Sequence, residues 1–151
     1  MKTFTMTGPK GAGRSHVLLS LIADLKRRGH RVGVVRHLRR DDLEIDQPGK
    51  DTYEYRMQGA EKVILSGRRR CAIFENREQE LGVAELLSAF EGYDFLFLEE
   101  YFLSGLPMIE VQSEQSVIVR QEGGPLSFQG ISALTDFLEH FDEVKEQVLP
   151  C

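Results

Sequence analysis

The sequence predicts an α/β fold in which a mainly parallel, twisted sheet is flanked by helices. A short β-branched run, a glycine-rich loop and a helical pattern follow one another over residues 3–28. Residues 31–37 (RVGVVRH) then read as a second strand, and two strands joined by such a helix form a right-handed parallel unit. Residues 93–99 (YDFLFLE) are the most apolar run, which is typical of a strand deep in a sheet.

Length and composition indicate one ordinary globular domain spanning residues 1–151, with a mass of 17.2 kDa. No apolar run approaches the roughly 20 residues that cross a bilayer, and the N-terminus leads into a strand without a signal-like segment. We therefore expect a cytoplasmic protein with no membrane partner. The net charge of -5 argues against nucleic-acid binding, and the two cysteines, Cys71 and Cys151, lack metal-ligand spacing.

The loop after the first strand is the main candidate site. It reads GPKGAGRS, which matches the phosphate-loop pattern GxxxxGK[ST] except for one position. Consecutive loop amides and the positive end of the next helix form an anion site that suits a polyphosphate. The alternative is a plain connection between strand and helix. The predicted phosphate-binding residues are Gly8, Lys10, Gly11, Ala12, Gly13, Arg14, Ser15 and His16.

Arg14 stands where the pattern has lysine. Arginine can hold phosphate oxygens bidentately, but its planar fork is larger than an ammonium group and sits differently. Binding can therefore survive where hydrolysis does not. Ser15 would offer its hydroxyl to a magnesium ion, or would only begin the helix.

The remaining pattern alternates strands and helices. After the helix of residues 15–28, a charged loop over residues 38–50 is expected near the phosphate site. Short helices are predicted at 50–58 and 81–90, and strands at 61–66, 69–75, 107–111 and 116–120. An amphipathic helix over 131–141 should close the domain and leave an acidic tail that frays.

Two glutamates end the apolar strand of residues 93–99. A carboxylate in this place can hold magnesium directly or through water, and Glu99 is the candidate. Glu100 is more simply explained as a solvated residue where the strand leaves the sheet.

Several blocks together resemble one family. They are GPKGAGRS with its helix, RGHRVGVVRH, DLEIDQPGKDTYEYRMQGAEKVIL and YDFLFLEEYFLSGLPMIEV, which cover most of residues 3–111. The most specific piece is residues 46–52 (DQPGKDT) followed by Gly59-Ala60, because general phosphate-loop proteins have no reason to carry it. On these blocks the chain resembles the molybdopterin-guanine dinucleotide biosynthesis protein B (MobB) family.

The resemblance implies a three-layer, P-loop NTPase-like α/β fold, GTP and Mg²⁺ at the loop, and a homodimer. It also implies a GTP-binding adaptor in molybdenum cofactor biosynthesis, whose partner is the molybdenum cofactor guanylyltransferase. Glu99 would be the acidic residue at the strand end, and Asp46 a second candidate for the metal. His37, Lys50 and Asp51 match positions beside the nucleotide. Guanine preference rests on the resemblance alone, since the chain has no Asn-Lys-x-Asp motif.

Departures from the family pattern leave the activity open. Arg14 replaces lysine, and Glu99-Glu100-Tyr101 replaces the usual Glu-Gly-Phe, so that a charge stands where a glycine amide would face the γ-phosphate. We therefore expect weak or absent GTPase activity, at most a slow GTPase. The alternatives are a non-hydrolysing scaffold that binds a partner and, third, a small-molecule kinase, for which the sequence offers no evident base.

Overall fold

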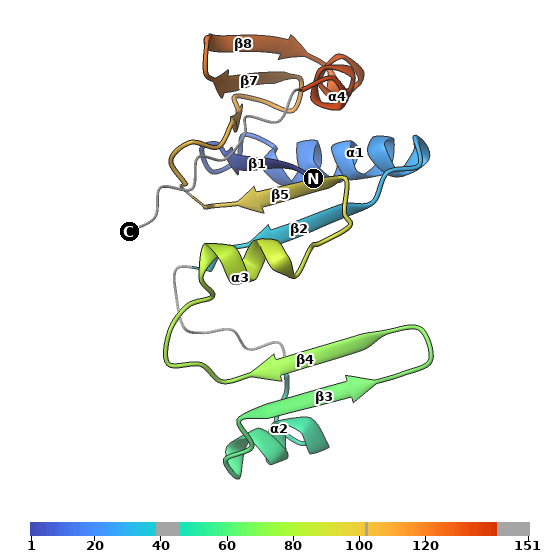
Figure 1. The fold of residues 1–151 in the computed structure, drawn as a ribbon, viewed down its shortest axis with the longest axis vertical. Helices are drawn as coiled ribbons and strands as arrows, with labels where there is room; N and C mark the ends of the chain where they lie inside the picture. Colours follow the sequence, from blue (N-terminus) through green and yellow to red (C-terminus); the bar gives the residue numbers. More distant parts are fainter. Residues whose placement is uncertain (39–45, 102, 142–151) are drawn as a thin grey trace. The chain divides into compact units, whose positions relative to one another are not determined.

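The structure is a computed structural model that describes residues 1–38, 46–101 and 103–141 (Figure 1). Its contacts group into two compact units, residues Met1–Leu38 with Leu87–Cys151, and residues Arg39–Leu86. The single domain over residues 1–151 stays a prediction. Most of the charged loop predicted at 38–50 and the predicted acidic tail lie outside the described residues.

The first unit is built on a six-stranded sheet with the order β2-β5-β1-β6-β7-β8. Strands β2, β5, β1 and β6 are parallel, whereas β7 and β8 continue the sheet as antiparallel strands. The mainly parallel α/β sheet predicted from the sequence is thus confirmed. The strands are β1 (Lys2–Thr7), β2 (Val32–Arg36), β5 (Phe95–Glu99), β6 (Met108–Val111), β7 (Ser116–Gln121) and β8 (Gly124–Gln129).

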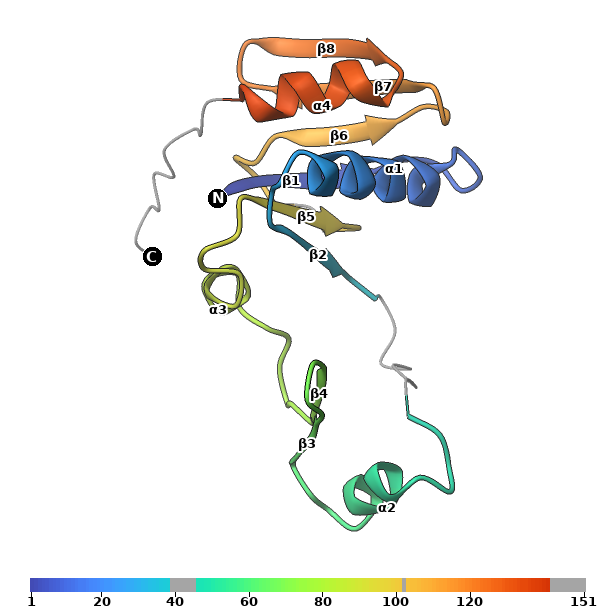
Figure 2. The ribbon, with the colours of Figure 1, turned by 90° about the vertical axis from the view of Figure 1, so that its right-hand side faces the viewer.

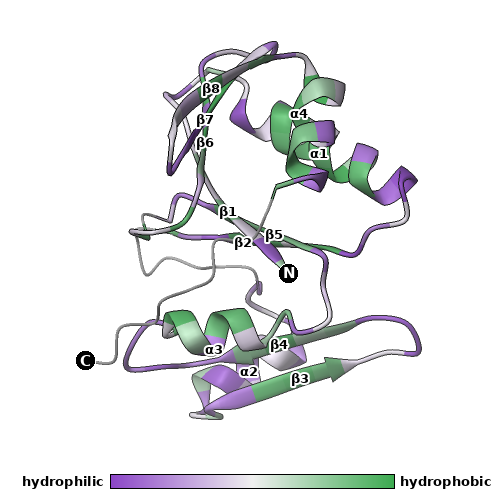
Figure 3. Cartoon of the chain, turned by 45° about the horizontal axis from the view of Figure 1, so that its top comes forward, coloured by the Kyte–Doolittle hydropathy of each residue, from purple (hydrophilic) through white to green (hydrophobic). Residues whose placement is uncertain are grey.

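Two helices, α1 (Arg14–Arg27) and α4 (Ile131–Glu139), lie on the same face of this sheet (Figures 2 and 3). The side chains that α1 buries include Val17, Leu18, Leu21 and Leu25, at the spacing of one helix face. They pack with Phe4 of β1, with Phe95 and Phe97 of β5 and with Leu134 and Leu138 of α4. This apolar contact holds α1, and therefore the loop that precedes it, against the sheet.

The alternation of β5 decides which of its residues meet α1. Successive side chains of a strand point to opposite faces, so Phe95, Phe97 and Glu99 share the face that carries α1. Leu96 and Leu98 point to the other face and are fully buried. There the Phe90 ring lies so close to Gly33 that a side chain on Gly33 would collide with it.

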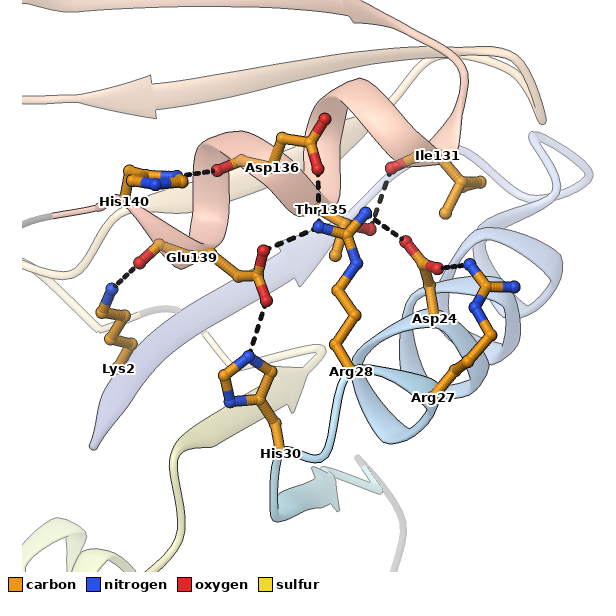
Figure 4. Close-up of polar contacts among 10 residues, drawn as sticks. All are labelled: Lys2, Asp24, Arg27, Arg28, His30, Ile131, Thr135, Asp136, Glu139 and His140. Carbon is orange, nitrogen blue, oxygen red and sulfur yellow. Dashed lines mark hydrogen bonds and ion pairs between the residues drawn. The ribbon is translucent and has the colours of Figure 1, made fainter.

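A polar network joins the carboxyl end of α1 to α4 (Figure 4). Arg28 lies 2.7 Å from Glu139 and 2.6 Å from Asp136 of α4, and 2.9 Å from Asp24 of α1. His30 contacts the same Glu139 carboxylate at 2.6 Å. The hydrogen bond from His30, followed by that from Arg28, outweighs burial and lowers the pKa of Glu139.

The second unit contains α2 (Asp51–Met57) and a hairpin of β3 (Lys62–Ser66) and β4 (Cys71–Glu75). Helix α3 (Val83–Ser88) crosses the boundary between the units. One face of the hairpin carries the buried Val63, and its neighbour Phe74 has Arg56 of α2 over its ring at 5.4 Å. The opposite face presents Ile64 and Ile73, which are 56% and 58% exposed.

The predicted elements agree with the observed ones, apart from their ends, with one exception. Strand β8 begins in Gly124-Pro125, a pair that favours a turn, so no strand was predicted there. Proline is tolerated because β8 is an edge strand. Among the described residues, no helix has the length and apolar character that crossing a membrane requires.

Candidate functional site

The glycine loop connects β1 to α1, in the strand-loop-helix order that the sequence predicts. β1 ends at Thr7, residues 8–13 form the loop, and α1 begins at Arg14. Within the loop, the Ala12 amide donates to the Pro9 carbonyl at 3.1 Å. Lys10, Ser15 and His16 are exposed, so these three polar side chains are accessible to a ligand.

Two glycines of the loop are required by their surroundings. A Cβ on Gly8 would lie 2.6 Å from the carbonyl oxygen of Val111, at the end of β6. Gly13 has a φ of 82°, in the left-handed region, and a Cβ there would collide with Cγ of Glu114. A side chain on Gly8 would therefore displace the backbone at the end of β6, and one on Gly13 would displace the side chain of the exposed Glu114.

Glu99 lies beside the first turn of α1. It is the last residue of β5, aligned with Met6 of β1 and with Arg36 of β2. Its Oε1 is 3.4 Å from Nε of Arg14, and its Oε2 is 3.8 Å from Nε of Arg36. The carboxylate is nearly buried between two guanidinium groups, with 6% of its side chain exposed.

Arg14 contacts three acceptors, from the glycine loop and from the end of β5. Its Nη1 donates to the Gly8 carbonyl at 3.2 Å and forms a close ion pair with Oε1 of Glu100. Its Nε faces Glu99. The guanidinium that replaces the phosphate-loop lysine is thus surrounded by oxygen atoms of its own chain.

His37 lies at the same edge of the sheet as the loop, directly after β2. Its amide donates to the Glu99 carbonyl at 3.0 Å, and its ring is 5.0 Å from the ring of Tyr101. The two rings therefore form an aromatic pair at the carboxyl ends of β2 and β5, where parallel sheets bind ligands.

The other predicted residues belong to the second unit. Oδ1 of Asp46 accepts hydrogen bonds from the Thr52 hydroxyl at 3.0 Å and from the Gln47 amide at 3.1 Å. Lys50 and Asp51 are exposed at the start of α2, where Asp51 suits the positive helix end. These contacts give Asp46 a structural part in the turn that leads into α2. Its predicted role at a metal stays a prediction.

Magnesium needs few protein ligands, because it keeps waters and binds phosphate oxygens. Oε1 of Glu99 is buried and has no hydrogen-bond partner among the described residues, so it retains acceptor capacity. Within the same residues, no group of three or more acidic, histidine or cysteine side chains could hold a metal by itself. The site fits a magnesium ion that is bound mainly through a nucleotide.

Two contacting residues are missing from the sequence analysis of the site. Glu114, in the connection from β6 to β7, packs against Gly13, and Arg36 faces Glu99. No local motif marks Glu114. The position of Arg36 at the end of a predicted parallel strand was the only available signal, because such strand ends gather at one edge.

Comparison with protein families gives one match over most of the chain. The family model described as "MobB: Molybdopterin guanine dinucleotide synthesis protein B" matches residues 3–123. Two curated relatives are named "Molybdopterin-guanine dinucleotide biosynthesis adapter protein". The Escherichia coli protein is 38% identical over 80 residues, 52% of this chain and 45% of the relative. The Haemophilus influenzae protein is 27% identical over 112 residues, 73% of this chain and 62% of the relative. The chain thus matches less than two thirds of either relative's length.

Solved structures share the fold. A crystal structure of Bacillus subtilis MobB matches with a TM-score of 0.60 and 18% identity, over 74% of this chain and 68% of the other. A MobB homologue from Bacillus stearothermophilus matches with a TM-score of 0.55 and 18% identity, over 74% and 63% of the two chains. At this identity the likeness concerns the fold.

Proposed function

The chain belongs to the MobB family, and we propose that it is a GTP-binding adaptor in molybdenum cofactor biosynthesis, at the formation of molybdopterin-guanine dinucleotide. The names of its relatives support the pathway. The observation that carries the nucleotide part is the glycine loop between β1 and α1, with a nearly buried carboxylate, Glu99, beside the first turn of α1. This arrangement suits a polyphosphate with a magnesium ion.

The loop residues 8–16 would surround the phosphates, with Lys10 and Arg14 as the cationic side chains. Ser15 and Glu99 would hold magnesium, which neutralises phosphate charge when it is bound. Asp46, in the second unit, is the second candidate that the family resemblance gives, and its buried Oδ2 faces Nη1 of Arg56 at 3.8 Å. His37 would lie beside the nucleotide, whereas the same role for Lys50 and Asp51, which belong to the second unit, stays a prediction.

Hydrolysis is expected to be weak or absent. The group that replaces the lysine, Arg14, already faces two carboxylates, so less of its charge is available to a γ-phosphate. Phosphoryl transfer depends on positive groups that stabilise charge in the transition state. The adaptor would therefore be at most a slow GTPase.

The proposed partners are the molybdenum cofactor guanylyltransferase and a second copy of this chain, in the cytoplasm. Support for a homodimer comes from the hairpin face that carries Ile64 and Ile73, more than half exposed on neighbouring strands. Adjacent exposed isoleucines, here flanked on the same face by the Lys62–Glu75 ion pair, are a candidate contact for a partner.

The test is a calorimetric titration of the purified protein with GTP and, separately, with ATP, each with magnesium. Micromolar affinity for GTP, about -8 kcal/mol, with much weaker ATP binding, is the expected result. A second arm measures binding of the guanylyltransferase with and without GTP. Absence of heat with both nucleotides, from protein with a cooperative unfolding transition, would contradict the nucleotide part.

A scaffold that binds its partner without nucleotide is the second candidate. The contacts of Arg14 with Glu99 and Glu100 favour it, because they neutralise the Arg14 guanidinium without a ligand. This candidate predicts a guanylyltransferase complex whose affinity is the same with and without GTP.

A further inference from the structure

Arg14 is the cation that a phosphate would have to reach, and its exposed fraction is small. Only 21% of the side chain is exposed, and the Nη1 atom is shared between the Gly8 carbonyl and the Glu100 carboxylate. Nε is buried and faces Glu99. A phosphate that binds Arg14 bidentately, as guanidinium groups prefer, must first displace one of these acceptors.

Of the two carboxylates, Glu100 is the one that can move. Glu99 is part of β5 and lies between Arg14 and Arg36, with 6% of its side chain exposed. Glu100 follows the strand, and 25% of its side chain is exposed. Its carboxylate is therefore partly accessible to solvent, whereas that of Glu99 is nearly buried.

The backbone of Glu100 is strained in the paired state. Its φ is 65°, and no other non-glycine residue in the described part of the chain has a positive φ. The Glu100 amide still donates to the carbonyl of Met6 in β1 at 3.1 Å. The backbone therefore turns out of the extended conformation directly after β5 stops pairing with β1. A side chain in this left-handed conformation is unfavourable and persists only where surrounding contacts hold it. The ion pair with Arg14 is such a contact.

The charges around the loop favour the ion pair of Arg14 with Glu100 over the binding of an anion at Arg14. Glu114 packs against Gly13, so the acidic side chains Glu99, Glu100 and Glu114 all border the start of α1. The cations next to Glu99 are Arg14 and Arg36, both paired with it, whereas Lys10 of the loop is exposed. The three carboxylates therefore reduce the attraction that a glycine loop normally has for anions.

We propose that Glu100 is an internal clasp on the phosphate loop. Its carboxylate occupies the position on Arg14 that a phosphate group of a nucleotide would take, so a nucleotide competes with the protein's own side chain. This proposal rests on the proposed function, because it takes the polyphosphate of a nucleotide as the ligand that competes with Glu100. It makes Glu100 a determinant of nucleotide affinity.

Calorimetry on four proteins tests the clasp: the native chain, Glu100→Gln, Arg14→Gln/Glu100→Gln and the control Glu122→Gln. Glutamine keeps the length and the backbone strain of Glu100 but removes its charge. Glu122 is exposed directly after β7, which runs antiparallel to β6, so it lies at the opposite edge of the sheet from the loop. The probes are GTP with magnesium and inorganic tripolyphosphate, which has no base.

Glu100→Gln should bind both probes at least about tenfold more tightly than the native chain, because the competing charge is gone. The gain should disappear in the double variant, which lacks the guanidinium, and Glu122→Gln should bind as the native chain does. A double-mutant cycle compares the free energies of unfolding in urea, without ligand, of the native chain, Arg14→Gln, Glu100→Gln and the double variant. It should give a favourable coupling energy between Arg14 and Glu100.

The outcomes separate the clasp from the proposed function. If the native chain and Glu100→Gln bind GTP equally, the clasp is wrong and the adaptor remains. If the native chain binds no GTP while Glu100→Gln binds both probes, the clasp is supported and GTP binding by the native adaptor is contradicted. If neither the native chain nor any variant binds GTP or tripolyphosphate, the clasp and the proposed nucleotide binding are both overturned.

Discussion

Arg14 and Glu99 face each other across the start of α1 and the end of β5, with Nε and Oε1 separated by 3.4 Å. Arg36 approaches the same carboxylate from β2, at 3.8 Å. The carboxyl ends of two parallel strands and the first turn of the first helix are therefore joined by one nearly buried side chain.

Glu99→Gln should lower the free energy of unfolding by about 1–3 kcal/mol, because two guanidinium groups lose their shared charged acceptor. Urea unfolding at neutral pH measures this, with Glu122→Gln as the matched charge change. Equal midpoints for the two variants would mean that the Glu99 contacts contribute little.

Gly13→Ala should destabilise the chain more than Gly11→Ala. Both glycines have a left-handed φ, 82° and 86°, which costs alanine about 1–2 kcal/mol. A Cβ on Gly11 meets nothing within 4 Å, whereas one on Gly13 would collide with Glu114. Thermal unfolding of the two variants isolates this collision, and equal losses would contradict the close packing of Glu114.

Arg28→Met should lower the urea midpoint several-fold more than Arg27→Met. Arg28 links Asp24 of α1 to Asp136 and Glu139 of α4, whereas Arg27 pairs with Asp24 only, among the described residues, and has 77% of its side chain exposed. Exposed ion pairs contribute little to stability. Equal shifts would show that α4 is held by its apolar contacts without help from Arg28.

Stability should fall as the pH is lowered from about 5 toward 3, because carboxyl groups with lowered pKa values lose their partners on protonation. Burial alone would raise the pKa of Asp24, but hydrogen bonds from Thr135 and Arg28 lower it, and those from His30 and Arg28 lower that of Glu139. A carboxyl group whose pKa is lower in the folded protein stabilises the fold fully when the pH is above its unfolded pKa. This stabilisation is lost as the pH falls through its folded pKa. Asp24→Asn should flatten the pH profile, and an unchanged slope would contradict the assignment.

Ile64→Asp/Ile73→Asp should convert a homodimer to a monomer, since like charges would face each other at the covered sheet face. Light scattering after gel filtration measures the mass. Met57→Asp, on α2 and 54% exposed, is the control and should leave the dimer intact. A native chain that is monomeric at high concentration would contradict the proposed dimer.

Local patterns were sufficient for most of the fold. The apolar residues of α1 repeat with a helical period, and the short apolar run FLFLE in β5 is typical of a buried strand. The glycine loop and residues 46–52 were also recognisable as motifs, and the family model confirms the predicted family. Such features depend on residues that are neighbours in the chain.

The tertiary structure alone placed β8 in the sheet, Glu114 against Gly13 and Glu100 on Arg14. These contacts join segments that are far apart in sequence, and they depend on strand order, on register and on the turn that the backbone makes at Glu100. A one-residue change of register would turn Glu99 away from α1. Sequence periodicity carries no information on such pairings, which is why the residue replacing the lysine was evident from the sequence while its partners were not.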